Sequence, residues 1–287
     1  MWGLKRIGFQ WVRNLPGIHC SGPKEANVVK NKDTFRWLLV LFLFCSVSTS
    51  LGVSAAGIRK LNRTESLAYY QNRYLVKTPD DKLVDNQGNG YEKLYGVRNF
   101  RAVLNGVVYR GGANNDYNKY KIRANHNPLP PEAFPNLCKE GFGTAVYLYP
   151  TNYDKAPKIT TCKSSMDQST QKLTYLQLSP HVKDSDARAV LTMIYKKITT
   201  DSDYSPIYLH CWNGWHASGL ISAFTLRQFC DFSAEQAVKY WDRNTDGANK
   251  ASYHESLRQK IRAFKPDPSL RIDASIKSRI CPTAKGF

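Results

Sequence analysis

A strand–loop–helix pattern around Cys211 constrains this 287-residue chain more than any other feature. Residues 206–210 form a short apolar run with a β-branched residue and a tyrosine, which is typical of a buried strand. Residues 218–227 carry apolar side chains at helical spacing. Cys211 therefore lies where a strand turns into a helix. Backbone amides and the helix dipole converge at such a position, which stabilises a thiolate and attracts an anion.

The loop resembles the signature of the cysteine-dependent protein tyrosine and dual-specificity phosphatases. That signature is His-Cys, two residues, Gly, two residues, Arg, Ser or Thr, and Gly. The chain supplies all but one of these positions, with His210, Cys211, Gly214, Ser218 and Gly219. The Arg position holds Ala217. In the family this Arg donates two N–H groups to the phosphate and follows it into the transition state, which Ala cannot do.

The resemblance covers residues 92–265 and is closest to the bacterial type. Residues 95–101 and 106–112 resemble the opening of such a domain, and residues 142–149 resemble the core strand that follows. Tyr175, Leu176 and Leu178 resemble the strand before the general-acid loop.

The general-acid Asp of that family is not found in its place. It should lie about four residues after Tyr175, where the chain reads Leu178-Ser179-Pro180-His181. His181 and Asp184 are candidates for a substitute acid, and Asp186 is also displaced from the expected position. The alternative is that these are ordinary polar loop residues.

Alternating strand and helix patterns predict an α/β fold with a mixed, mainly parallel central sheet flanked by helices, like that of the dual-specificity phosphatases. The patterns place strands at residues 105–110, 142–149, 173–178 and 206–210, and helices at 130–140, 187–198, 218–230, 233–241 and 252–264. Residues 150–171 are expected to form a loop, and residues 265–287 an irregular tail held by Cys281.

The domain organisation follows from an uncharged run at residues 37–58, preceded by basic residues. Its small residues near Ala55 fit a signal-peptide cleavage site. An uncleaved membrane anchor and a buried core helix are the alternatives. We expect a targeting region at 1–55, an N-terminal arm at 56–91, a phosphatase-like domain at 92–265 and a tail at 266–287. The protein is then periplasmic or extracellular, or tethered to the inner membrane by residues 37–58.

Five cysteines follow the targeting region, and an oxidising compartment would leave one of them unpaired. We favour Cys138–Cys162 and Cys230–Cys281 as disulfides, with Cys211 free, although spacing does not determine connectivity. The alternative is that the four are small buried apolar residues.

A net charge of +18 favours an anionic partner. We expect an anionic or phosphorylated ligand, an envelope protein or an anionic membrane surface. Nucleic acid is not expected, because no run of five basic residues occurs. A solvated basic surface without a specific partner is the alternative. We expect neither a cofactor nor a metal.

The resemblance assigns roles around Cys211, which would be the nucleophile. The alternative is a buried structural cysteine. Ser218 matches the hydroxyl that eases thiolate departure, or it caps the helix. The phosphate loop would comprise His210, which braces it, with Trp212, Asn213, Gly214, Trp215, His216, Ala217 and Gly219. The two tryptophans either border the pocket and stack on a sugar or aromatic ligand, or pack against neighbouring loops. Arg110 and His216 are candidates for a substitute cation.

Magnitudes favour a catalytically impaired protein. Losing one preorganised transition-state donor costs about 10²–10³ in rate, and losing a general acid costs roughly a further 10²–10⁴. The sequence therefore predicts a pseudophosphatase that binds or scaffolds an anionic or protein ligand. One alternative is a divergent cysteine phosphatase acting on phosphoprotein, phospholipid or phosphosugar through a Cys211 phospho-enzyme. Another is different thiol chemistry at Cys211.

Overall fold

The computed structural model describes residues 62–76, 78–113, 128–200 and 204–287, which belong to one compact unit, Val53–Phe287. The strands are β1 (Val97–Leu104), β2 (Val108–Ala113), β3 (Thr144–Tyr147), β4 (Ile159–Lys163), β5 (Thr170–Gln177) and β6 (Ile207–Cys211). The α-helices are α1 (Arg63–Tyr74), α2 (Ala133–Lys139), α3 (Asp184–Thr199), α4 (His216–Phe229), α5 (Ala234–Arg243), α6 (His254–Ala263) and α7 (Ala274–Ile280). Short 3-10 helices are η1 (Glu92–Leu94) and η2 (Pro268–Leu270).

The six strands form one sheet in the order β1-β2-β6-β3-β5-β4. The inner strands β2, β6, β3 and β5 run parallel, whereas β1 and β4 pair antiparallel at the two edges. The α/β class with a mixed, mainly parallel sheet is thereby confirmed. Because β6 lies between β2 and β3, its carboxyl end opens at the centre of the sheet, where ligands bind in open α/β folds.

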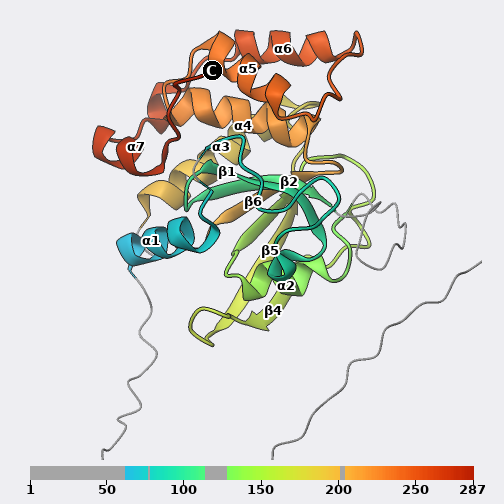
Figure 1. The fold of residues 1–287 in the computed structure, drawn as a ribbon, viewed down its shortest axis with the longest axis vertical. Helices are drawn as coiled ribbons and strands as arrows, with labels where there is room; N and C mark the ends of the chain where they lie inside the picture. The colour runs from blue at the N-terminus through green and yellow to red at the C-terminus, as the bar shows by residue number, and fades with distance from the viewer. Residues whose placement is uncertain (1–61, 77, 114–127, 201–203) are drawn as a thin grey trace, which may run out of the picture. The chain divides into compact units, whose positions relative to one another are not determined.

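Helices cover both faces of the sheet (Figure 1). The alternation of side chains along β6 explains why both faces are apolar. Ile207, Leu209 and Cys211 belong to the core shared with α3, α4, α5 and α6, while Tyr208 faces the aromatic core on the other side. Residues from α1 and α2 complete that second core.

Two segments expected to be irregular contain regular structure. Strand β4 lies within residues 150–171, and helix α7 lies within the tail. No residue of β4 is buried, so it lacks the apolar pattern by which a strand is recognised, and only its pairing with β5 makes it one. Helix α7 buries Ile280 alone. Helix α4 also begins two residues before the expected start at residue 218.

Helix α1 occupies part of the segment expected to be an arm. Asn62 and Glu65 form a capping box, in which each side chain accepts a hydrogen bond from the other residue's backbone amide. Tyr70 and Tyr74 of α1 are buried in the aromatic core. The expected targeting region, residues 1–55, and the uncharged run at 37–58 lie outside the described residues.

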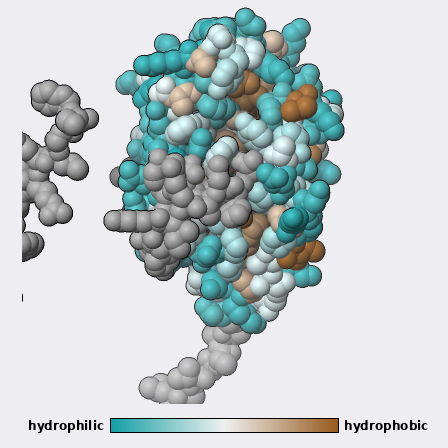
Figure 2. Space-filling view, turned by 90° about the vertical axis from the view of Figure 1, so that its right-hand side faces the viewer, coloured by the Kyte–Doolittle hydropathy of each residue, from teal (hydrophilic) through white to brown (hydrophobic). Residues whose placement is uncertain are grey.

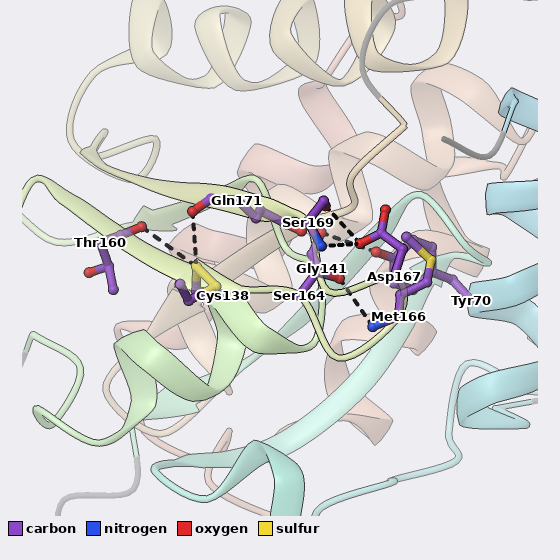
Figure 3. The surroundings of a disulfide bond; sticks show 10 residues. Tyr70, Cys138, Gly141, Thr160, Ser164, Met166, Asp167, Ser169 and Gln171 are labelled. Atoms are coloured by element: carbon purple, nitrogen blue, oxygen red, sulfur yellow. Dashed lines mark hydrogen bonds between the residues drawn. A yellow bond between two sulfur atoms is a disulfide. The ribbon is translucent and has the colours of Figure 1, made fainter. Parts of the chain in front are cut away.

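Two disulfides join segments that are distant in the sequence. Cys138 bonds to Cys162, and Cys230 bonds to Cys281, which are the pairs favoured above. Figure 3 shows Cys138 beside the backbone of β4 and β5, with its sulfur 3.6 Å from the carbonyl oxygen of Thr160. Within the described ranges, Cys211 is the free cysteine, and it is buried.

The face drawn in Figure 2 is mainly hydrophilic, with apolar residues in small separate patches. The large exposed apolar side chains lie in different parts of the chain, at Leu75, Ile159, Val182 and Tyr253. None of the helices described here has the length and apolar character needed to cross a bilayer.

Candidate functional site

Cys211 lies at the carboxyl end of β6, between the ends of two neighbouring parallel strands. It is level with Gly112 of β2, and the preceding His210 is level with Tyr147 of β3. The Cys211 side chain is buried, and its sulfur lies 3.4 Å from the hydroxyl oxygen of Ser218. Four residues separate Cys211 from His216, the first residue of α4, and Ala217 is the second residue of that helix. The thiol therefore faces a helix N-terminus.

The loop carbonyls point away from this centre, towards the surrounding scaffold. The Trp212 oxygen accepts a hydrogen bond from the backbone N–H of Ala113 at 2.9 Å. The Asn213 oxygen accepts one from Asn99 Nδ2 at 2.8 Å, and the Gly214 oxygen accepts one from Arg110 Nη2 at 2.8 Å. Three successive peptide oxygens of the loop are therefore held on its outer side.

The same contacts determine where the loop amides point. All described peptide bonds are trans, and in a trans peptide the N–H points opposite to the C=O. The N–H groups of Asn213, Gly214 and Trp215 therefore point inward, away from the scaffold. These three amides donate to no acceptor in the described part of the chain. Inward N–H groups beside a helix N-terminus form a concave site for an anion, here called the cup.

Glycines allow the loop to approach the sheet this closely. A Cβ on Gly112 would lie 2.5 Å from the Asn213 carbonyl carbon. A Cβ on Gly214, whose φ is +75°, would lie 2.6 Å from the carbonyl carbon of Gly111. The backbones of β2 and the loop are thus in direct contact, with no room for a side chain between them.

His210 braces the loop from beneath and is electrically neutral. Its Nε2 lies 2.9 Å from the Tyr175 hydroxyl, and its Nδ1 lies 3.3 Å from the carbonyl oxygen of Cys211. This pattern requires Nδ1 to carry the proton and the tyrosine to donate to Nε2. The imidazole also stacks on the rings of Tyr208 and Tyr147. Complete burial lowers the His210 pKa to about 3.

Trp215 and His216 are held by the segment that connects α5 and α6. Trp215 Nε1 donates to Asp246 Oδ2 at 2.9 Å. The His216 ring bonds through Nε2 to the Ala248 carbonyl and lies 4.4 Å from the His254 ring. Burial lowers the pKa of His216, so this side chain is neutral at pH 7 and provides no substitute cation there.

Arg110 also fails to enter the cup, although it is completely buried. Its Nη2 donates to the Gly214 oxygen and, at 3.0 Å, to the Asn244 oxygen. Both bonds hold the guanidinium on the carbonyl side of the loop. A substitute for the signature Arg would have to lie on the opposite side, where the amides point.

The candidate acids are placed differently from one another. Asp184 is exposed at the start of α3, while Asp186 Oδ2 accepts a hydrogen bond from the Ser179 amide at 2.7 Å. The His181 ring lies 4.8 Å from the Tyr149 ring. Burial raises the pKa of Tyr149, and the negative charge of a Cys211 thiolate raises it further. Tyr149 follows Leu148, whose amide donates to the His210 carbonyl at 2.9 Å, so His181 is the candidate that lies near the carboxyl end of β6.

Burial also lowers the pKa of His181, and the neighbouring charge of Lys260 lowers it further. This imidazole is consequently neutral at pH 7 and could donate a proton only at acid pH. Elsewhere, no group of three or more His, Cys, Asp or Glu side chains in the described ranges is arranged to hold a metal ion.

Two residues that shape the loop are not among the site residues predicted from the sequence. Asn99 holds the Asn213 carbonyl from a position 114 residues earlier in the chain. Asp246 holds the indole of Trp215 and also pairs with Lys82. Asn99 lies in the 95–101 segment that resembles the opening of a phosphatase domain, but that resemblance assigns it no role, and Asp246 lies in no local motif, so only the tertiary contacts reveal their part in the site.

Comparisons with known proteins leave the family open. No protein-family model matches the chain, and no curated protein matches it either. Among solved structures, it is similar to the catalytic core of Siw14, with 14% identity over 63% of this chain and 88% of that chain, at a TM-score of 0.36.

Proposed function

We propose that this protein has a phosphatase-like fold and binds an oxyanion in the Cys211 loop without ordinary phosphatase turnover. One observation carries the proposal. Three loop carbonyls are bonded outward, so three amides converge inward beside a buried thiol at the N-terminus of α4. A phosphate group, free or carried by a ligand, is the anion that this arrangement suits best.

We expect turnover to be impaired because neither of the two candidate cations takes the place of the signature Arg. Ala217 is buried where the resemblance expects a guanidinium, and Arg110 is bound to the outer side of the loop. Anion binding needs only the amides and the helix dipole, whereas transition-state stabilisation needs charge that follows the transferred group. The expected loss of about 10⁴ or more in rate therefore applies to turnover and not to binding.

A divergent phosphatase is the second candidate, and the position of His181 near Tyr149 favours it. The Cys211 sulfur would attack phosphorus, the bond to the leaving oxygen would break, and His181 would protonate that oxygen. Water would then attack the phosphorus of the phospho-enzyme and break the S–P bond, which releases phosphate and restores the free Cys211. A lowered His181 pKa restricts this role to acid pH. The other thiol chemistry is less favoured, because both nitrogens of His210 and Nε2 of His216 are already bonded to other partners.

Export belongs to the same proposal. The two disulfides support an oxidising compartment, which is the periplasm or the extracellular space. The net charge of +18 supports an anionic partner, whether a phosphorylated ligand, an envelope protein or an anionic membrane surface.

A calorimetric titration of the full-length protein with tungstate tests the proposal. We expect wild-type protein and Cys211→Ser to bind tungstate with similar affinity, because the amides bind the anion. Gly214→Ala should bind at least about tenfold more weakly, since its Cβ would meet the Gly111 backbone at 2.6 Å and deform the loop. Absence of wild-type binding contradicts the proposal.

Hydrolysis of an aryl phosphate separates the two candidates. We expect background rates for both wild type and Cys211→Ser at pH 7. Robust turnover that disappears in Cys211→Ser would instead establish the divergent phosphatase. A rate that rises towards acid pH and is lost in His181→Asn would identify the acid.

A further inference from the structure

We propose that Asn99 is a positioning residue for the Cys211 loop. A bulge in β1 directs its side-chain amide at the Asn213 carbonyl, and this bond keeps the amide of Gly214 facing the oxyanion. The inference rests on the proposed function, which it deepens by naming the residue that preorganises the cup. Asn99 does not touch the anion and acts only through the loop backbone.

The pairing of β1 with β2 places the bulge at Asn99. Arg98 pairs with Gly112 and Arg101 pairs with Arg110, so two residues of β1 oppose the single residue Gly111 of β2. Bulges of this kind redirect side chains and are frequent beside functional sites. Here the bulge turns the Asn99 amide towards a loop that lies across β2.

The backbone of Asn99 is unusual for a residue with a Cβ. Its φ is +51°, in the left-handed region, and the residue is completely buried within a strand. Asn tolerates this region better than most residues, but the conformation is still costly. Its Oδ1 is buried without a partner among the described residues, which is a second cost. Both features lower the stability of the strand, so they need a reason elsewhere.

The hydrogen bonds of Asn99 stabilise the Cys211 loop. Asn99 Nδ2 donates to the Asn213 oxygen at 2.8 Å and to Asn86 Oδ1 at 2.8 Å, so both amide protons are used and the side chain has one orientation. Without this donor, the peptide between Asn213 and Gly214 can turn its oxygen inward. An inward carbonyl oxygen repels the anion that the N–H group attracts.

The substitution Asn99→Gly separates positioning from stability. Glycine adopts a φ of +51° without strain, which offsets the lost hydrogen bonds in the folded state. We therefore expect an unfolding midpoint close to that of wild type, together with tungstate affinity reduced about threefold to tenfold. Asn152→Gly is the matched control, because Asn152 also has a left-handed φ of +58° but is exposed and lies outside the loop. It should leave the tungstate affinity unchanged and should not lower the unfolding midpoint, because it relieves the same backbone strain.

A second readout uses the chemistry of Cys211 itself. The protein is alkylated with either anionic iodoacetate or neutral iodoacetamide, and mass spectrometry of the peptide that contains Cys211 measures each rate. The ratio of the iodoacetate rate to the iodoacetamide rate reports how strongly the inward amides attract an anion. We expect Asn99→Gly to lower this ratio by about threefold or more relative to wild type and to Asn152→Gly. A purely structural role would change both rates by the same factor.

The outcomes distinguish the two proposals. If wild type binds tungstate and Asn99→Gly changes neither the affinity nor the alkylation ratio, Asn99 has no positioning role. A parallel loss of affinity and unfolding midpoint would also overturn it. If wild type binds no tungstate, the proposed function fails, and the alkylation ratio alone decides the inference. A lower ratio of iodoacetate to iodoacetamide rates confined to Asn99→Gly supports it, and an unchanged ratio overturns it.

Discussion

The neutral, buried imidazole of His210 should make this protein less stable as the pH falls below about 6.5. We consider the substitution His210→Phe, which keeps a ring between the surrounding tyrosines but removes the titrating group. The native imidazole has a pKa of about 3, whereas an unfolded histidine titrates near 6.5. The folded-state pKa is lowered, so between these values the unfolded chain binds a proton that the native protein does not.

The magnitude follows from linkage. Where only the unfolded state is protonated, the free energy of unfolding falls by about 1.4 kcal/mol for each pH unit. The contribution of His210 to stability is therefore complete above about pH 6.5 and decreases as the pH falls towards 3. Between about pH 6.5 and pH 5.0 the wild-type protein should lose about 2 kcal/mol from this group alone.

Urea unfolding at about pH 7.5, 6.5, 5.5 and 5.0 measures this effect. His210→Phe should be less stable than wild type at pH 7.5 by about 1–3 kcal/mol, because the Tyr175 hydroxyl loses its partner. The difference should narrow by about 2 kcal/mol at pH 5.0. His181 and His216 also have lowered pKa values, but they are present in both proteins and cancel in the comparison.

Tyr175→Phe is the control for the lost hydrogen bond. It removes the contact with His210 and keeps the imidazole, so it should be destabilised at every pH and retain the wild-type slope. Equal pH slopes for wild type and His210→Phe would refute the reasoning, since they would mean that the imidazole is protonated in the native protein.

Two further predictions concern the contacts around the loop and the tail. Burial raises the pKa of Asp246, but the bonds from Lys82 and Trp215 outweigh it and lower the pKa overall, so its contribution to stability is present above about pH 4 and is lost at lower pH. Asp246→Asn should therefore weaken the acid dependence below pH 4 and increase the exposure of Trp215, measured by fluorescence quenching. Replacing Cys230 and Cys281 together by Ala opens a loop of 51 residues and should lower the free energy of unfolding by about 4 kcal/mol in chemical denaturation. An unchanged unfolding midpoint would show that the tail is held by packing alone.

Local patterns were sufficient for the fold class of this chain. The apolar run before Cys211, the helical spacing after it and the alternation of such elements predicted the α/β sheet, and the structure has it. For the two disulfide pairs the sequence supported a preference among several connectivities, and only the folded chain shows which cysteines meet. Strand β4 was missed, since its identity comes from pairing with β5 and not from its own sequence.

The sequence by itself determined that a cysteine loop joins a buried strand to a helix and that Ala217 replaces the signature Arg. Those properties depend on neighbours within a few residues. Only the tertiary structure decided that Arg110 lies outside the loop, that His210 is neutral, and that Asn99 bonds to the Asn213 carbonyl. Each of these depends on burial or on a contact made across the sheet, between residues as many as 114 positions apart, and no local pattern records such distances.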